Sequence, residues 1–325
     1  MYQSNERGIA EPTSVNVNNC IRWYSPLPDE EGYVLAEGDI VTLSLGVHID
    51  GYAVISSQTI HVRSSPAPAT GPVADATCAL HFITRGIVNT LSTGSTMQIQ
   101  DILREGLETF GVNVVEGSCL RRVRRFLVGQ QTIEEFHPKV LEFGSPNQEF
   151  SILPGEVYLL DLAISTGTGH VRVHSDLRPT IYTRSIARSK SHANFKLQAT
   201  RTLFTRLTSD PSMYSVFPFT LRQHPDPARA KLGVAELVTH GILQPCPVLL
   251  EKSQKAIVVR RTLTVLVRKA REVVVLGGGE LEAGIMWVRS EKGVRGGGEL
   301  ERAVRGDGVK VTELRRIEGE KMDLE

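Results

Sequence analysis

The sequence predicts a mixed α/β (α+β) fold. Branched apolar residues that alternate with small polar ones are typical of strands, and such runs occupy residues 40–49 and 53–62. Apolar residues at helical spacing predict a helix over 74–92. With 325 residues, 41% of them hydrophobic, the chain has enough apolar material for one large domain or two ordinary ones.

The first half of the chain continues this pattern. Asp50 and Gly51 lie between the two predicted strands, and an Asp-Gly pair in that position is typical of a β-hairpin turn. Pro66 then ends the strand region, and a second helix is predicted over about 97–110. The apolar run VYLLDLAIS at 157–165 predicts a buried strand whose only charged residue, Asp161, indicates an interior site.

The second half is basic at first and then Gly-rich. Residues 178–206 contain seven Lys or Arg and no Asp or Glu. A helix is predicted over about 227–240, with Asp226 as its N-cap and Gly241 just past its end, and a strand over 262–267. Beyond residue 270 the motif GGGELE occurs twice, and the Gly/Glu/Arg-rich composition of 271–325 predicts a disordered tail.

Composition excludes several classes of protein. The 37 Lys and Arg balance 36 Asp and Glu, so any charge-based binding must come from local patches. Cys20, Cys78, Cys119 and Cys246 lie far apart, which argues against a zinc module and against a disulfide framework. Apolar runs stay below the roughly 18 residues of a membrane span, so we expect no membrane partner.

Basic clusters are the candidate nucleic-acid-binding sites. The guanidinium group matches phosphate oxygens in a bidentate way, so clustered arginines indicate a polyanion partner. A solvated basic surface without a ligand explains the same clusters about equally well. The candidates are Arg121, Arg122, Arg124, Arg125, Arg184, Arg188, Lys190, Lys196, Arg260 and Arg261.

Several segments in order resemble one known family. They are GIAEPTSVNVNNC (8–20), YVLAEGDIVTLSLGVHIDGY (33–52), VYLLDLAISTGTG (157–169), RPTIYTR (178–184), and PFTLR with GVAELVTHGILQP (within 218–245). Over about 8–268 the chain is similar to the proliferation-associated, ErbB-receptor-binding proteins, which are non-catalytic relatives of type II methionine aminopeptidase. The resemblance implies a pita-bread fold over 1–270, in which two pseudo-symmetric halves enclose an antiparallel sheet, with a mostly helical insertion at about 190–245. Family members carry a helical segment before the GIAEPTS motif, so we expect a chain truncated at its N-terminus.

The resemblance also implies that a dinuclear metal site has been lost. The peptidases hold two divalent ions with two Asp, one His and two Glu, because a hard dinuclear site needs several oxygen ligands. The matching positions here are Ile55, Pro66, Arg121, Asp161 and Thr262. A cation in place of the metal-binding His repels a divalent ion, and Arg22-Trp23 takes the place of a substrate-orienting His. We therefore expect no metal, no cofactor and no catalysis.

The function implied by the resemblance is binding to the large ribosomal subunit or another structured RNA, in ribosome biogenesis or translation. The expected locations are the cytoplasm and the nucleus or nucleolus, and the expected state is a monomer with possible protein partners. Two alternatives stay open. One is a metal-dependent aminopeptidase with a rebuilt site, and the other is a transcriptional co-regulator or peptide-binding adaptor.

Overall fold

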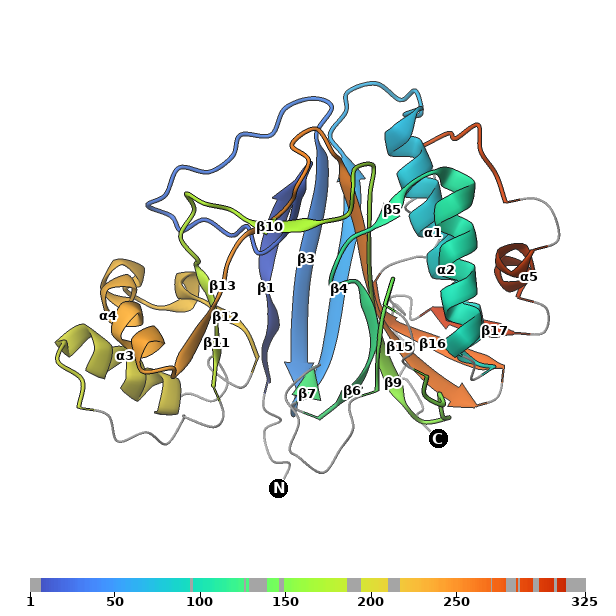
Figure 1. The fold of residues 1–325 in the computed structure, drawn as a ribbon. Helices are drawn as coiled ribbons and strands as arrows, with labels where there is room; N and C mark the ends of the chain where they lie inside the picture. Colours follow the sequence, from blue (N-terminus) through green and yellow to red (C-terminus); the bar gives the residue numbers. More distant parts are fainter. Residues whose placement is uncertain are drawn as a thin grey trace, which may run out of the picture.

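One large sheet runs through the centre of the molecule (Figure 1). The computed structural model describes residues 7–93, 96–125, 127–128, 139–145, 149–185, 194–209, 217–269, 271–278, 285, 287–294, 298–306 and 309–313. In spatial order the main path of the sheet is β1 (Arg7–Val17), β3 (Ile40–Ile49), β4 (Tyr52–His61), β15 (Val258–Lys269), β9 (Val157–Ser165), β6 (Cys119–Arg124) and β7 (Leu127–Val128). Neighbours along this path are antiparallel.

The hairpin predicted at Asp50-Gly51 is confirmed. Ile49 on β3 pairs with Tyr52 on β4, and the two turn residues have φ values of 50° and 82°. Both values lie in the left-handed region, as a type I′ turn requires. The register then places alternate β3 side chains on opposite faces of the sheet.

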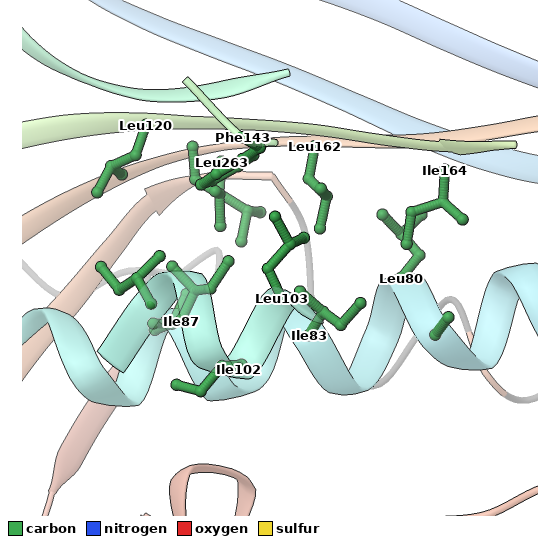
Figure 2. Close-up of a cluster of buried hydrophobic side chains, with 14 of the residues drawn as sticks. Leu80, Ile83, Ile87, Ile102, Leu103, Leu120, Phe143, Leu162, Ile164 and Leu263 are labelled. Atoms are coloured by element: carbon green, nitrogen blue, oxygen red, sulfur yellow. The ribbon is translucent and has the colours of Figure 1, made fainter. Parts of the chain in front are cut away.

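Two helices cover one part of the sheet. These are α1 (Pro72–Leu91), which begins on a proline, and α2 (Thr96–Phe110), so both predicted helices are confirmed. Figure 2 shows apolar side chains of the helices, including Ile83 and Leu103, meeting those of the strands, including Leu120, Leu162 and Leu263. None of the described helices is long and apolar enough to span a bilayer.

A smaller unit is inserted after β9 and packs around its own core. Its elements are β11 (Ile181–Arg184), α3 (Gln198–Ser209), β12 (Phe219–Thr220), α4 (Pro227–Thr239) and β13 (Leu243–Cys246). Asp226 caps α4 as predicted, because its side chain accepts a hydrogen bond from the Arg229 backbone N–H (2.9 Å). The strands form a separate sheet in the order β12-β11-β13, so the insertion is not helical throughout.

Short strands complete the architecture. β5 (Asn113–Val114) pairs with β9, and β8 (Val140–Glu142) pairs with β6 at the edge of the large sheet. A third small sheet has the order β10-β14-β2 and contains β10 (Val171–Val173), β14 (Leu249–Glu251) and β2 (Cys20–Arg22). The last of these strands carries Arg22 up to the large sheet, which brings it close to β9.

The described part of the C-terminal segment corrects the prediction of a disordered tail from residue 271. β16 (Glu272–Gly277) pairs with β15, and β17 (Lys310–Glu313) pairs in parallel with β16. Between them α5 (Glu299–Arg305) lies against α1 and α2, where Leu300 is fully buried. The Gly- and Glu-rich composition concealed these few well-placed apolar residues. Residues 314–325 lie outside the described part.

One face of β3 is apolar and open to solvent. Leu43, Leu45, Val47 and Ile49 are 39–53% exposed. They lie on the face of the sheet that α1 and α2 cover farther along, over β9 and β15, and we call this the outer face. The opposite face of the same strands, the inner face, carries the polar side chains described next.

Candidate functional site

Asp161 is the centre of a polar cluster on the inner face. It is 2% exposed and lies on β9, with Cys119 of β6 and Thr262 of β15 as its cross-strand partners. The two-residue period of β15 directs Arg260 and Thr262 to this face, and Val259 and Leu263 to the apolar core under the helices. A carboxylate predicted from sequence to be interior is thus confirmed as buried.

Three arginines surround this carboxylate. Arg260 forms a bidentate pair with it, in which Nε donates to Oδ1 (2.7 Å) and Nη2 donates to Oδ2 (3.0 Å). Arg22 forms an ion pair with Oδ2, and the Nη2 atom of Arg121 lies 3.5 Å from the same oxygen. Thr262 Oγ1 donates a further hydrogen bond to Oδ1 (3.2 Å).

Hydroxyl groups of β3 and β4 hold Arg260 in place. Its backbone N–H donates to Thr59 Oγ1 (2.9 Å), and the same hydroxyl donates to its carbonyl (3.0 Å). Its Nη1 atom donates to Ser44 Oγ (3.3 Å), and Ser57 donates to Thr262 Oγ1 (2.7 Å). The cluster is therefore a connected network across four strands and not an isolated ion pair.

The electrostatics of the cluster are dominated by positive charge. Burial, with added repulsion from Arg260 and Arg121, lowers the pKa of Arg22 to about 9. Burial also lowers the pKa of Arg260, and the carboxylate of Glu11 partly opposes the lowering for both arginines. One buried carboxylate does not offset three guanidinium groups, so the site retains positive charge.

The donor set does not fit a pair of divalent metal ions. Such ions need several oxygen or nitrogen ligands, and among the five positions that match the family's ligands Asp161 is the single carboxylate. Its oxygens already accept hydrogen bonds from Arg260 and Thr262. Within the described ranges, no group of three or more His, Cys, Asp or Glu side chains is placed to hold a metal ion.

The structure brings together most of the positions predicted to be lost metal ligands. Ile55, Arg121, Asp161 and Thr262 lie on the inner face, and Ile55 is 3% exposed. Pro66, which the resemblance matched to a metal ligand, does not lie at this site, because it is exposed in the segment after β4. Ser44, eleven residues before Ile55, occupies the inner face instead and contacts Arg260.

Sequence reasoning missed Ser44 because a serine in a strand carries no metal-ligand signal by itself. The signal that could have found Ser44 is its place in the alternation of side chains along β3. Residues of β3 at the same parity, such as His48, are buried, whereas Leu43 and Leu45 are exposed. Assigning the two metal-binding Asp positions of the family to Ser44 and Ile55 keeps the eleven-residue spacing, and both side chains lie on the buried inner face.

The predicted basic clusters do not form one surface. Arg121 and Arg122 are neighbours on β6 and therefore point to opposite faces, where Arg122 pairs with Glu156 (2.7 Å). Arg260 and Arg261 are 1% and 5% exposed, so these two candidates are buried and not open to a nucleic-acid ligand. Arg261 lies on the outer face, in register with Leu162 under the helices.

The other candidates differ in accessibility. Arg125 is exposed and donates to the Asp50 carbonyl (2.7 Å), and Lys196 is exposed near the start of α3. Arg124 is half-buried, as is Arg184, which donates to the Leu207 carbonyl (2.8 Å). Arg188 and Lys190 lie outside the described residues.

The class of protein follows from comparison with known families. The model of the metallopeptidase family M24 matches residues 1–181, more than half of the chain, so the chain belongs to this family. The resemblance recognised from sequence motifs and the predicted pita-bread fold are thereby confirmed.

Two similar proteins and one solved structure show which members of the family this chain resembles. The chain is 32% identical over 305 residues to "Probable metalloprotease arx1" of Schizosaccharomyces pombe, covering 80% of this chain and 71% of that protein. It is 34% identical over 272 residues to "Proliferation-associated protein A" of Dictyostelium discoideum, covering 81% and 65%. The solved "Structure of a thermophilic Arx1" matches the fold with a TM-score of 0.78 at 20% identity, covering 93% of this chain and 84% of that one.

Proposed function

We propose that this chain is a catalytically inactive member of the M24 family that binds structured RNA of the large ribosomal subunit. The observation that carries the proposal is the state of Asp161, whose oxygens are engaged by arginines where a peptidase needs metal ligands. Arginine cannot replace a metal ion as the activator of a water molecule, because it carries no vacant coordination position.

Support for the binding role is separate from the loss of the metal site. The family resemblance carried by the sequence motifs implies ribosome association, and Arg125 and Lys196 supply exposed cations. Recognition by phosphate contact and shape needs no base-reading motif. With a role in ribosome biogenesis or translation, we expect the protein in the cytoplasm and the nucleus or nucleolus.

Catalytic inactivity is tested on the purified protein by metal analysis and by methionine release from a short peptide. After incubation with Mn²⁺, Co²⁺ or Zn²⁺ and desalting, we expect far less than one ion per chain and no released methionine. Stoichiometric metal or measurable release would overturn this part of the proposal and favour a peptidase with a rebuilt site.

RNA binding is tested by co-sedimentation with ribosomal subunits at low and high salt, with a nuclease control. We expect salt-sensitive migration with the large subunit, since each phosphate contact contributes to the salt dependence. Combined Arg125→Gln and Lys196→Gln is expected to weaken migration, whereas Lys310→Gln, which removes an exposed lysine on β17, serves as the control. Migration that resists nuclease would favour a peptide-binding adaptor.

A further inference from the structure

We propose that Arg22, Arg121 and Arg260 form a site that binds one phosphate group, supplied either as inorganic phosphate or as a small phosphate monoester. This site is distinct from the surface proposed to contact RNA. It occupies the inner face of the sheet, where the family's metal ligands have been replaced.

The first argument is the charge of the cluster. Three guanidinium groups converge on Asp161, and every one of them lies within 3.5 Å of its carboxylate oxygens. Counted with Asp161 alone, the cluster therefore carries two excess positive charges, and the nearby carboxylate of Glu11 offsets part of them. Like charges held together in a buried place are unfavourable unless an anion joins them.

The second argument is the supply of hydrogen-bond donors. Each of the three guanidinium nitrogens of Arg260 already donates a hydrogen bond, to Asp161 or to Ser44. Arg121 differs, because its Nε atom is buried and has no hydrogen-bond partner. A guanidinium group has five N–H donors, so Arg121 has N–H groups left for an oxyanion.

The third argument is access. The side chains of Arg22 and Arg121 are 18% and 20% exposed, whereas Arg260 is 2% exposed. A small anion can thus reach two of the three arginines from solvent, with Arg260 and Asp161 forming the fixed floor. A phosphate within an RNA duplex is flanked by nucleotides on both sides, so a small free phosphate suits arginines that are only about one-fifth exposed better.

Arginine recognises carboxylate and phosphate groups best, and the negative charge of each decides which of them fits this site. A carboxylate carries one negative charge, whereas a phosphate monoester carries about 1.5 to 2 at neutral pH. The excess of positive charge around Asp161 is better matched by the phosphate. Its several oxygens also suit two arginines that approach from different strands, β2 and β6.

Binding is measured by isothermal titration calorimetry and by thermal unfolding of the whole chain, at constant ionic strength. The probes are inorganic phosphate, glycerol 3-phosphate and acetate, with chloride as the reference. We expect saturable phosphate binding and a higher unfolding temperature than in chloride, and a weaker response to acetate. Preference for glycerol 3-phosphate would identify the monoester as the source, whereas equal or better binding of inorganic phosphate would identify the free ion.

Variants locate the binding site. Arg121→Gln is expected to weaken phosphate binding at least about tenfold, as loss of a charge-assisted contact predicts. In chloride, the same change is expected to leave the unfolding temperature unchanged or to raise it, because it relieves repulsion among the three arginines. A merely structural arginine would not give this pair of effects. Arg22→Gln provides a second, independent variant.

Arg122→Gln is the matched control. It removes the same charge from the next residue of β6 but on the opposite face, where Arg122 contacts Glu156. Phosphate binding by this variant is expected to equal that of the wild type. The proposal is overturned if the wild type responds to phosphate no more than to chloride, or if Arg121→Gln and Arg122→Gln bind phosphate equally well.

Discussion

At the scale of single residues, the partners of a side chain decide its chemistry. Asp161 is a carboxylate on the inner face of the sheet, as a metal ligand would be. Its bidentate contact with Arg260 and its contacts with Arg22 and Arg121 make it the anionic centre of a structural network. These cations favour the ionised carboxylate. We expect that replacing Asp161 with an uncharged residue leaves buried positive charge unopposed.

Replacing this carboxylate tests the network. Asp161→Asn is expected to lower the free energy of unfolding by about 3–5 kcal/mol, because it leaves the buried Arg260 without its counter-ion. Urea denaturation measures the loss. The double variant Asp161→Leu with Arg260→Met is expected to be less destabilised than Asp161→Asn, and a larger loss in the double variant would contradict this account.

Glu156 predicts a pH dependence of stability. Burial raises its pKa, but hydrogen bonds from Lys139, Tyr158 and Arg122 outweigh that effect and lower the pKa to about 2 from its ordinary 4.5. A depressed folded-state pKa contributes stability above pH 4.5, and this contribution is lost as pH falls towards 2.

We therefore expect Glu156→Gln to be less stable than the wild type at neutral pH, and its stability to decline less steeply between pH 4.5 and 2. Chemical denaturation at a series of pH values measures both effects. Parallel stability curves for the two proteins over this range would show that the contacts of Glu156 do not favour its ionised form.

At the scale of elements, close packing of α1 against α2 depends on a glycine. A Cβ atom at Gly106 of α2 would overlap Ile83 Cγ1 and lie 2.6 Å from Ile83 Cδ1. Ile83 is fully buried and β-branched, so it has few alternative rotamers within a helix. The helices can approach this closely only because position 106 has no side chain.

Gly106→Ala is accordingly expected to destabilise the protein by about 1–3 kcal/mol, although alanine favours helices over glycine by about 1 kcal/mol. Thermal or urea unfolding provides the comparison. Gly293→Ala is the control, since a Cβ atom there meets no atom within 4 Å. Equal stability of the two variants would mean that α1 and α2 can separate at little cost.

At the scale of the whole molecule, helices cover the outer face unevenly. They pack over β9 and β15, while Leu45 and Val47 of β3 remain about half exposed. Apolar surface of this kind promotes association between molecules in water. The inner face of the same strand is buried, so the two faces of β3 should respond differently to polar substitution.

At concentrations high enough for the wild type to associate, combined Leu45→Thr and Val47→Thr is expected to reduce that association, with a change in unfolding free energy within about 0.5 kcal/mol. Size-exclusion chromatography over a range of concentrations measures association. Ile55→Thr, which places a hydroxyl on the buried inner face of β4, is expected to cost about 1–3 kcal/mol instead. Unchanged association in the double variant would show that this face does not drive it.

Much of the fold was predictable because its signals are local. The hairpin at Asp50-Gly51, helices α1, α2 and α4, and strand β9 all follow from turn chemistry, capping residues and periodicity within a short window. The buried state of Asp161 follows in the same way from its apolar neighbours. The described C-terminal elements were missed because their few apolar residues are buried by contacts with α1 and β15, which composition does not record.

The sequence by itself determined the α/β class, the family and the loss of most metal-ligand residue types. Only the tertiary structure decided that Arg22, Arg121 and Arg260 converge on Asp161, since they come from three strands far apart in the chain. It also separated Arg121 from Arg122 and buried Arg261. The physical reason is that a strand alternates its side chains between two faces, and what covers each face depends on segments distant in sequence.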